Sequence, residues 1–289
     1  MPKTILITGA TGNVSTAVIA ALKGSKNTVR AMVRDEAKAG ALKSAGVEIV
    51  FGDFDKPETL TKAFNGVNTL WTLTSNGPSA PVQNSYALWH ARKAGVSHIV
   101  RMSAVGAAHN APTINSRLHA LSDTELAQSG VAFTILKPHF FMQNLMMSAQ
   151  SIAKDGAMYW AMGEGRMGLI DVRDIGEFAA KVLTSGGHEG KTYDLTGPAS
   201  LNMAQIAEGF ATALKKPVKY QPVGLEQAAT SMSQMGMNAY AVNMMCDYLT
   251  AYSENWGDFV TNHFQSLMGK APRSFADFAR DFAPAFGAK

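Results

Sequence analysis

The feature that most constrains the fold is the amino-terminal segment, in which a short apolar run leads into glycines and then into a helical pattern. Residues 4–8 are β-branched or apolar, as is typical of a strand buried on both faces of a sheet. Gly9 and Gly12 follow, and apolar residues recur at helical spacing from Val14 to Leu22. Glycines in such a turn let the backbone approach a phosphate, which the free N–H groups at the helix start then face. The segment therefore predicts a dinucleotide-binding loop rather than an ordinary turn.

The glycine spacing indicates which kind of loop this is. It reads Gly9-x-x-Gly12-x-x-Ser15 instead of Gly-x-Gly-x-x-Gly, and Thr-Gly-Ala-Thr-Gly resembles the loop of extended and atypical short-chain dehydrogenase/reductases. Ser15 stands where that loop has its third glycine, so its hydroxymethyl group predicts a small shift or slightly weaker binding. The expected pyrophosphate contacts are Gly9, Thr11, Gly12 and Asn13, and Val14 is expected as a further cofactor contact.

The rest of the first half alternates strand and helix patterns. Apolar runs predict strands at residues 28–33, 48–51, 67–73 and 98–102, with a helix at 82–94. This alternation predicts an α/β fold, a Rossmann-type doubly wound parallel sheet. We expect residues 1–141 to form the dinucleotide-binding domain, with 167–180 and 191–195 returning to it. Residues 142–289 would form a smaller, mostly helical substrate-binding or lid domain.

The residue after the second strand indicates the cofactor. An acidic side chain there binds the ribose 2′-hydroxyl of NAD, whereas a cation suits the 2′-phosphate of NADP. Arg34 follows this strand with a guanidinium that can bind phosphate through two N–H groups, and Lys38 adds a charge one helical turn later. If the strand ended one residue later, Asp35 would take that position. We therefore predict NADP(H), with NAD(H) as the alternative.

Other loops follow the carboxyl ends of predicted strands, where ligands of parallel sheets bind. The loop after the fourth strand offers Thr74 and Ser75 as cofactor contacts. By resemblance to the short-chain family, Asp53 and Phe54 would face the adenine, and Ser103 would stand at the position of the catalytic serine. Asp55 has the spacing of a helix cap.

The catalytic pair of ordinary short-chain reductases is missing from the sequence. In those enzymes a Tyr-x-x-x-Lys motif supplies a phenol that donates a proton and an ammonium group that lowers its pKa. No tyrosine in this chain is followed by lysine four residues later, and the corresponding stretch holds His119 and Asp123. Tyrosine-dependent carbonyl reduction is therefore disfavoured. The same holds for the epimerase or dehydratase chemistry of sugar nucleotides, which relies on that tyrosine.

Longer motifs resemble one branch of the atypical group, the NmrA-like family. These motifs are His119-x-x-x-Asp123, Ser129-Gly130, Lys137-Pro138, Phe141-Met142-Gln143-Asn144, Asp171-Val-Arg-Asp-Ile-Gly, Tyr193-Asp-Leu-Thr-Gly-Pro198 and Pro272-Arg-Ser-Phe-Ala-Asp-Phe. Asp123, Lys137 and Gln143 replace the Glu, Arg and Glu of the family pattern. The resemblance spans nearly the whole chain. It implies a Rossmann fold that binds NADP(H), in a reductase of quinones or dyes or in a redox-sensing regulator without turnover.

His119 is the catalytic candidate. Its imidazole could donate a proton, orient a quinone oxygen or hold the ribose hydroxyls. Alternatively, it is a helix residue hydrogen-bonded to Asp123 one turn away, without a chemical task. The segment expected to close over the nicotinamide ring contains Pro138, Phe140 and Phe141. His139 in the same segment is a weaker candidate.

The second half holds most of the 16 methionines. Methionine and aromatic surfaces adapt to flat apolar ligands, although a Met-rich helical core would give the same pattern. The expected substrate contacts are Met142, Met146, Trp160, Met235, Met237 and Tyr240. Helices are predicted at 144–153, 173–183, 202–214, 225–235 and 238–252, and strands at 191–195 and 218–222.

Composition sets the class of protein. Of the 289 residues, 46% are hydrophobic and 17% are charged, and the net charge of +4 comes from scattered side chains without a basic run. These values describe a folded globular chain without a nucleic-acid interface. The single cysteine, Cys246, excludes an internal disulfide and a cysteine metal cage. We find no apolar stretch of membrane-spanning length and no signal peptide, and expect a cytoplasmic protein without a metal site.

Together these features predict an NADPH-dependent oxidoreductase that transfers hydride to a hydrophobic, planar, conjugated acceptor, with a quinone as the leading candidate. Such an acceptor yields a resonance-stabilised anion, so solvent can supply the proton and a fixed tyrosine acid is dispensable. The alternative is a regulator that binds NADP(H) and a protein partner. The sequence leaves a homodimer open.

Overall fold

The computed structural model describes residues 2–288, apart from the side chains of Glu36, Lys38 and Ala41. The chain forms two compact units. The first contains residues 1–111, 115–137 and 175–193, and the second contains 112–114, 138–174 and 194–289. Residues 167–174 thus lie in the second unit, while 175–193 return to the first.

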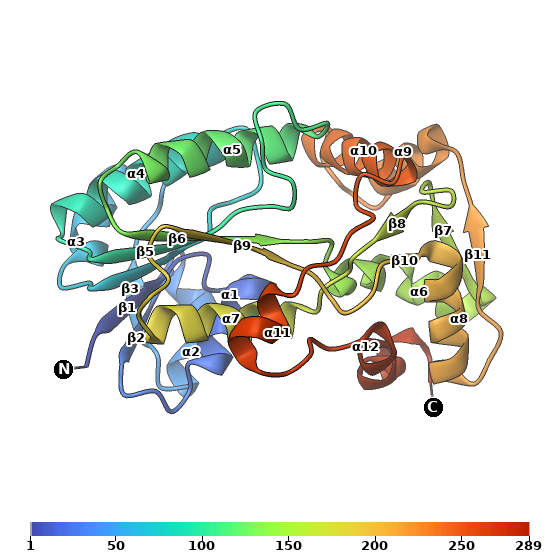
Figure 1. The fold of residues 1–289 in the computed structure, drawn as a ribbon, viewed down its shortest axis with the longest axis horizontal. Helices are drawn as coiled ribbons and strands as arrows, with labels where there is room; N and C mark the ends of the chain where they lie inside the picture. Colours follow the sequence, from blue (N-terminus) through green and yellow to red (C-terminus); the bar gives the residue numbers. More distant parts are fainter. Residues whose placement is uncertain (1, 289) are drawn as a thin grey trace. The chain divides into compact units, whose positions relative to one another are not determined.

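A seven-stranded sheet forms the centre of the first unit (Figure 1). Its strands run in the order β3 (Glu48–Phe51), β2 (Thr28–Val33), β1 (Thr4–Ile7), β4 (Thr69–Thr72), β5 (His98–Met102), β6 (Phe133–Pro138) and β9 (Lys191–Leu195). Leu6 of β1 pairs in parallel with Arg30 on one side and Leu70 on the other. The chain order reverses at this point, which confirms the doubly wound Rossmann-type sheet and makes the carboxyl end of β1 the edge at which a ligand is expected.

Helices cover both faces of this sheet. Figure 1 shows α3 (Leu60–Phe64), α4 (Ala80–Lys93) and α5 (Ile114–Ala127) on one face, and α1 (Asn13–Ala21), α2 (Gly40–Ser44) and α7 (Val172–Thr184) on the other. Ile5, Leu6 and Ile7 are completely buried between the two layers. A Cβ atom at Gly176 would lie 2.6 Å from the carbonyl carbon of Ala17, so glycine is what lets α7 approach α1 so closely.

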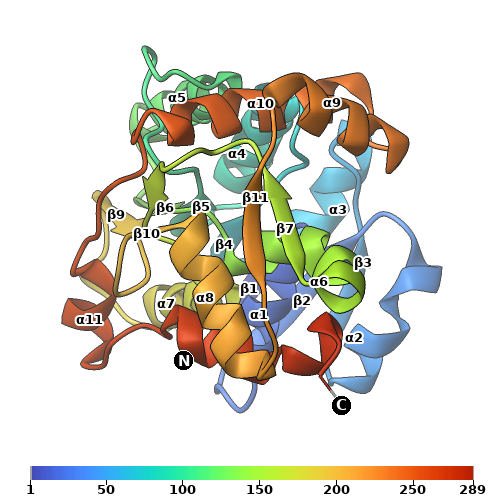
Figure 2. The ribbon, with the colours of Figure 1, turned by 90° about the vertical axis from the view of Figure 1, so that its right-hand side faces the viewer.

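The second unit combines short strands with helices around its own apolar core. Figure 2 shows β7 (Ala157–Trp160) beside β11 (Lys219–Pro222), flanked by α6 (Ala149–Asp155) and α8 (Met203–Leu214). A second small sheet pairs β8 (Arg166–Met167) with β10 (Leu201–Asn202). The other helices are α9 (Leu225–Gln234), α10 (Ala239–Ser253), α11 (His263–Met268) and α12 (Phe275–Asp281). Phe210, Phe278 and Phe286 are fully buried and form part of the core.

For one predicted α-helix, the helix type is wrong over its first half. Residues 144–153 were expected to form a single α-helix, but a 3-10 helix runs over Met142–Ser148 and α6 begins only at Ala149. The N–H of Asn144 donates to the carbonyl of Phe141, which is the tighter 3-10 spacing. The hydroxyl of Ser148 accepts a hydrogen bond from the Trp160 indole (2.8 Å), so a buried contact lies at the change between the two helix types.

Side chains cap the starts of two helices. Asp171 accepts a hydrogen bond from the N–H of Arg173 at the start of α7, and Ser274 and Asp277 form a capping box at α12. The cap at Asp55 is wrong. A turn from the carbonyl of Asp53 to the N–H of Lys56 shifts the helix start, so the short 3-10 helix Pro57–Thr59 follows Lys56 instead.

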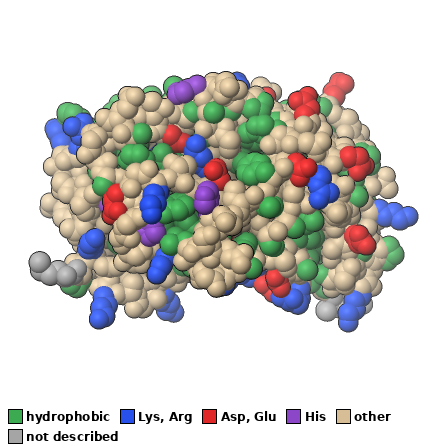
Figure 3. Space-filling view, viewed as in Figure 1, with side chains coloured by type: hydrophobic (Ala, Val, Ile, Leu, Met, Phe, Trp, Pro, Cys, Tyr) green, Lys and Arg blue, Asp and Glu red, His purple; other side chains and the backbone are tan. Residues whose placement is uncertain are grey.

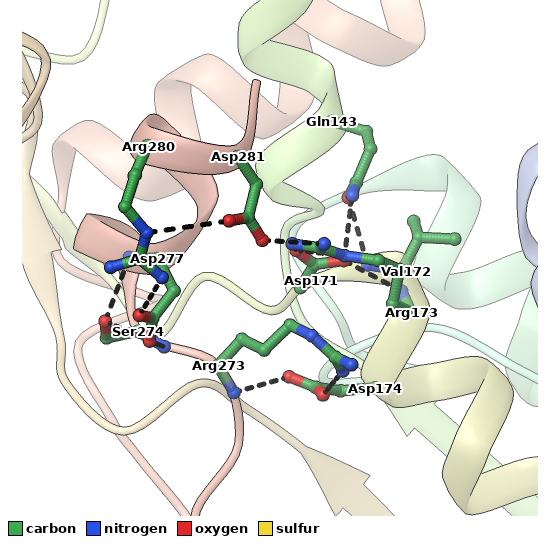
Figure 4. Close-up of polar contacts among 10 residues, drawn as sticks. All are labelled: Gln143, Asp171, Val172, Arg173, Asp174, Arg273, Ser274, Asp277, Arg280 and Asp281. Atoms are coloured by element: carbon green, nitrogen blue, oxygen red, sulfur yellow. Dashed lines mark hydrogen bonds and ion pairs between the residues drawn. The ribbon is translucent and has the colours of Figure 1, made fainter. Parts of the chain in front are cut away.

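An ion-pair network joins the start of α7 to α12 within the second unit (Figure 4). The buried carboxylate of Asp171 accepts hydrogen bonds from Arg173 and Gln143, and Arg173 also bonds Asp281 (2.8 Å). Burial alone would raise the pKa of Asp171, but the hydrogen bonds outweigh it and lower this pKa below its ordinary value. The stability that this carboxylate contributes is therefore present above the ordinary pKa and is lost as pH falls through the lowered one.

Charges of both signs are scattered over the face drawn in Figure 3. Its Lys and Arg side chains are interspersed with Asp and Glu and form no large patch of one sign. On this face the distribution agrees with the scattered cations of the sequence.

Candidate functional site

The glycine loop after β1 is a tight, exposed turn. Gly9 has φ +59°, and a Cβ atom there would lie 3.1 Å from the carbonyl oxygen of Leu73. The N–H of Gly12 donates to the carbonyl of Gly9 (2.9 Å), which closes the turn. Gly9 is therefore required by the backbone conformation, while Gly12 has an ordinary φ of −83° and leaves the outer surface of the turn without a side chain.

The loop leads directly into the amino terminus of α1. Gly12 is the N-cap residue, and in the described part of the chain no side chain caps this helix. The first turn carries no acidic residue, and Thr11, Gly12 and Asn13 are exposed. Uncapped N–H groups and the positive end of the helix dipole thus face solvent at the carboxyl end of β1, which is suited to binding an anion.

Ser15 is a structural part of the loop. Its fully buried hydroxyl donates to the carbonyl of Thr8 (2.8 Å) and accepts from the indole N–H of Trp71 (3.0 Å). The hydroxymethyl group that replaces the usual glycine therefore joins α1 to β1 and β4 through two hydrogen bonds. Its effect on cofactor binding remains a prediction.

The Ser15 bond to Trp71 gives a stability prediction. Ser15→Ala leaves the buried indole N–H without its partner, so we expect the free energy of unfolding to fall by about 1–3 kcal/mol. Urea unfolding followed by tryptophan fluorescence measures this loss. Ser44→Ala is the matched control, because Ser44 is exposed and, among the described residues, its hydroxyl bonds only Gly40 of its own helix. Equal midpoints for the two variants would contradict the assigned role.

Arg34 is the first residue after β2. The strand ends at Val33, as predicted, and the Arg34 side chain is exposed. Asp35 does not take that position, because its carboxylate accepts a hydrogen bond from the N–H of Ala37 (2.9 Å) and caps the 3-10 helix Glu36–Ala39. The Lys38 side chain lies outside the described residues. The geometry therefore leaves a cation, not an anion, directly after β2, and its contact with a ribose phosphate remains a prediction.

The loop after β3 is locked by its own hydrogen bonds. The carboxylate of Asp53 accepts from the N–H of Asp55 (3.1 Å), and the N–H of Asp53 donates to Thr59 (2.9 Å). Phe54 is only 8% exposed and packs in the apolar cluster around Leu60, so little of its ring can face a ligand. The adenine contacts expected of Asp53 and Phe54 remain predictions.

The loop after β4 is tied to α4. The hydroxyl of Thr74 accepts a hydrogen bond from the side-chain amide of Asn84 (3.0 Å). The hydroxyl of Ser75 donates to the side-chain oxygen Oε1 of Gln83 (2.8 Å). Gln83 in turn donates to Asp55 (2.9 Å), which links this loop to the one after β3. Thr74 and Ser75 thus stand at the carboxyl edge of the sheet with fixed side chains, and their cofactor contacts remain predictions.

A buried charged cluster lies at the carboxyl end of β5. Asp123 of α5 accepts hydrogen bonds from the Arg101 guanidinium and from the Ser103 hydroxyl (2.7 Å), and the Lys137 ammonium lies 3.8 Å from it. His119 does not bond Asp123, so the expected partner is wrong, whereas the question of a chemical task for His119 remains open to test. Its Nδ1 lies instead 3.2 Å from Nη2 of Arg101. Arg101 and Lys137 are members that sequence reasoning missed, because β5 and β6 meet α5 only in the fold.

The electrostatics of this cluster keep His119 neutral. Burial, followed by the positive charges of Arg101 and Lys137, lowers the pKa of His119 to about 3. An imidazole with this pKa carries no proton to donate as an acid near neutral pH. His119 can therefore act as a hydrogen-bond donor or acceptor, whereas the predicted option of proton donation is disfavoured.

The segment after β6 mostly builds the core of the second unit. Phe140 is 8% exposed and contacts the rings of Trp160 and Tyr252, while Phe141 is half-buried. His139 donates through Nε2 to the carbonyl of Gly257 and accepts the N–H of Phe140 at Nδ1. Burial lowers the pKa of His139 to about 4, although its bond to Gly257 opposes this. Contacts of Pro138, Phe140 and Phe141 with nicotinamide remain predictions.

An apolar pocket of about 310 Å³ opens within the second unit. Two of the predicted substrate residues, Trp160 and Met235, line this pocket. Other lining residues are Met147, Tyr159, Gln227 and Met232. Met147, Tyr159 and Met235 rank among the exposed large hydrophobic residues, at 40%, 50% and 65% exposure. The described lining includes no Lys, Arg, Asp or Glu, so this pocket suits a neutral ligand.

The other predicted substrate residues lie elsewhere. Met142 is 1% exposed in the core, and Met146, Met237 and Tyr240 are half-buried outside the described pocket lining. The Tyr240 hydroxyl is buried, and no group in the described chain bonds it. Tyr159 and Gln227 were missed. The sequence signal that could have pointed to Tyr159 is its place as a large aromatic residue on the exposed side of the short strand β7. No sequence signal points to Gln227.

Within residues 2–288, no helix has the length and apolar character needed to cross a bilayer. In the same described part of the chain, no three His, Cys, Asp or Glu side chains gather in a way that could hold a metal ion.

The chain is similar in sequence and in structure to known proteins. The sequence model of the NmrA-like family matches residues 1–278. The chain is 36% identical to the NAD(P)H azoreductase of Xenophilus azovorans, over 98% of this chain and 99% of the relative. It is 30% identical to quinone oxidoreductase 2 of Escherichia coli (strain K12), over 84% and 86%. A crystal structure of an NADPH-dependent quinone oxidoreductase from Escherichia coli complexed with NADPH is similar, with a TM-score of 0.87 at 27% identity and coverage of 96% and 99%.

Proposed function

This chain belongs to the NmrA-like family, and from that membership and the site geometry we propose that it is an NADPH-dependent oxidoreductase. Its acceptor is a planar, conjugated compound, with quinones as the leading class. The relatives that reduce azo compounds and quinones support this choice, because both acceptor types are flat and conjugated.

The observation that carries the proposal is the pairing of an exposed glycine turn with a cation at the end of β2. The turn has no side chain at Gly12, and α1 begins there without a cap, so a diphosphate can reach the N–H groups of Asn13 and Val14. Arg34 adds a guanidinium that matches a 2′-phosphate through two N–H groups. These residues fit NADP(H) better than NAD(H), because Asp35 is engaged as a cap.

The chemistry requires little acid catalysis from the protein. Bound NADPH supplies the hydride. A quinone or azo compound that accepts hydride spreads the negative charge over its conjugated system, so water can supply the proton afterwards. The absence of a Tyr-x-x-x-Lys pair from the sequence is therefore compatible with turnover, and the residues mainly position the reactants and exclude water.

The neutral pocket of the second unit supports a hydrophobic acceptor. Its wall combines the rings of Tyr159 and Trp160 with the flexible thioethers of Met232 and Met235. Thioethers and aromatic faces adapt to flat ligands of different outline, which fits a reductase with several acceptors. We propose this pocket as the acceptor site.

The experiment that tests the function is NADPH oxidation by the purified chain across a panel of quinones, azo dyes and triarylmethane dyes. We expect saturable turnover with at least one quinone, and slower turnover with NADH than with NADPH. NADPH binding without turnover on any acceptor would instead favour a redox-sensing regulator.

Filling the pocket tests the proposed acceptor site separately. Ser231 lines it, whereas Ser233 on the same helix is exposed and lies outside the described lining. Ser231→Trp should raise KM for a naphthoquinone about tenfold, a loss of roughly 1.4 kcal/mol of binding. Ser233→Trp should leave KM unchanged. If both variants match the unmodified chain in steady-state kinetics, the acceptor binds elsewhere.

A further inference from the structure

The charged cluster beside His119 determines where this imidazole carries its proton. Arg101 lies near the carboxyl end of β5, and its side chain is 3% exposed. Asp123 holds the guanidinium through Nη1, and the Ser103 hydroxyl donates to the other carboxylate oxygen (2.7 Å). With both oxygens of Asp123 engaged, Arg101 has a fixed orientation and directs Nη2 at His119.

The contact between Arg101 and His119 permits only one direction of hydrogen bonding. A guanidinium has donors and no acceptor, so Nη2 must donate to Nδ1 across the 3.2 Å that separate them. Nδ1 therefore presents its lone pair, and the single proton of a neutral imidazole lies on Nε2. Protonation of Nδ1 would place two donors against each other beside a second cation, Lys137.

The Nε2–H group of His119 is left available for a ligand. No group in residues 2–288 forms a hydrogen bond with Nε2, and this atom is not among the buried polar atoms without partners. The cluster lies at the carboxyl end of β5, the edge at which ligands of parallel sheets bind. A fixed donor with a free N–H at this edge suits an oxygen atom that becomes negative.

We infer that Arg101, oriented by Asp123, holds His119 as the Nε2–H tautomer, and that this N–H donates a hydrogen bond to the acceptor atom that gains negative charge during hydride transfer. The inference rests on the proposed reductase function. The acceptor gains two electrons with the hydride, and the proton that completes its reduction comes from water. His119 keeps its own proton throughout. Arg101 and Asp123 are positioning residues, and of these three side chains only His119 would contact the acceptor.

Paired substitutions of His119 test the donor. His119→Ala removes the N–H, and we expect kcat with a naphthoquinone to fall about tenfold, less than for a fully enclosed oxyanion donor. His119→Gln places an amide N–H at a similar distance, so kcat should stay within about threefold of the unmodified chain. The Kd for NADPH should be the same in all three proteins. Equal kcat values for the Ala and Gln variants would overturn the inference.

The tautomer can be measured without any acceptor. Nitrogen NMR of histidine-labelled protein, assigned by the signal lost in His119→Gln, should show Nε2 protonated and Nδ1 free from about pH 5.5 to 8. Arg101→Met should mix the two tautomers and make kcat depend on pH in this range. An Nδ1–H tautomer in the unmodified chain would overturn the role of Arg101 even if turnover is normal. Absence of turnover on every acceptor would refute the proposed function while leaving this NMR result interpretable.

Discussion

Replacing Gly12 by valine should abolish dinucleotide binding. A Cβ atom at Gly12 would lie 3.3 Å from the carbonyl oxygen of Gly9, and the two methyl groups of the introduced side chain would extend over the face that we assign to the diphosphate. Because φ of Gly12 is −83°, valine can adopt the backbone conformation, and the loss should be one of binding rather than of folding. We expect Kd for NADPH to rise by more than about a thousandfold, equivalent to over roughly 4 kcal/mol.

Gly224 provides a matched control for this substitution. It is also the N-cap of a helix, α9, with an extended conformation (φ −70°, ψ 153°) and open space around its Cβ position. Gly224→Val should bind NADPH like the unmodified chain in isothermal titration calorimetry. If Gly12→Val keeps its affinity and its thermal midpoint, the diphosphate does not lie against this turn.

Removing the Arg34 guanidinium should weaken the binding of NADPH far more than the binding of NADH. A charge-assisted hydrogen bond contributes about 1.5–3 kcal/mol, so Kd for NADPH should rise about 10- to 100-fold in Arg34→Ala. NADH has no 2′-phosphate, and its Kd should change less than about threefold. Titration of both cofactors into the same protein preparation gives the ratio directly.

Arg92→Ala is the control for loss of a positive charge at a distance, because Arg92 is exposed on α4. It should leave the ratio of the two Kd values unchanged. Equal losses for NADPH and NADH in Arg34→Ala would mean that this side chain does not read the 2′-phosphate, and the cofactor preference would then need another source.

The sequence was sufficient where a local pattern determines the structure. The strands at 28–33, 48–51, 98–102 and 191–195 have the predicted bounds, because short runs with β-branched and aromatic or aliphatic residues, bounded by turns, favour strands. The turn after β1 was also predictable from the local sequence, because Gly9 readily adopts the positive φ that this turn has. The family resemblance then covered nearly the whole chain.

The remaining features depend on contacts between segments far apart in the sequence. Arg101 on β5, Asp123 on α5 and Lys137 on β6 form one cluster only after the sheet and its covering helix have formed. No local spacing predicts that Arg101, rather than Asp123, is the partner of His119. The pocket in the second unit likewise combines residues from β7 and α9, such as Tyr159 and Gln227.

The central claim is that the loop after β1 binds the diphosphate of NADPH, and calorimetric titration of NADPH into the purified chain tests it most directly. The account predicts a saturable heat with one site per chain, tighter binding of NADPH than of NADH, and no comparable heat with the Gly12→Val variant. No heat with either NADPH or NADH, in a protein that melts cooperatively, would contradict the account.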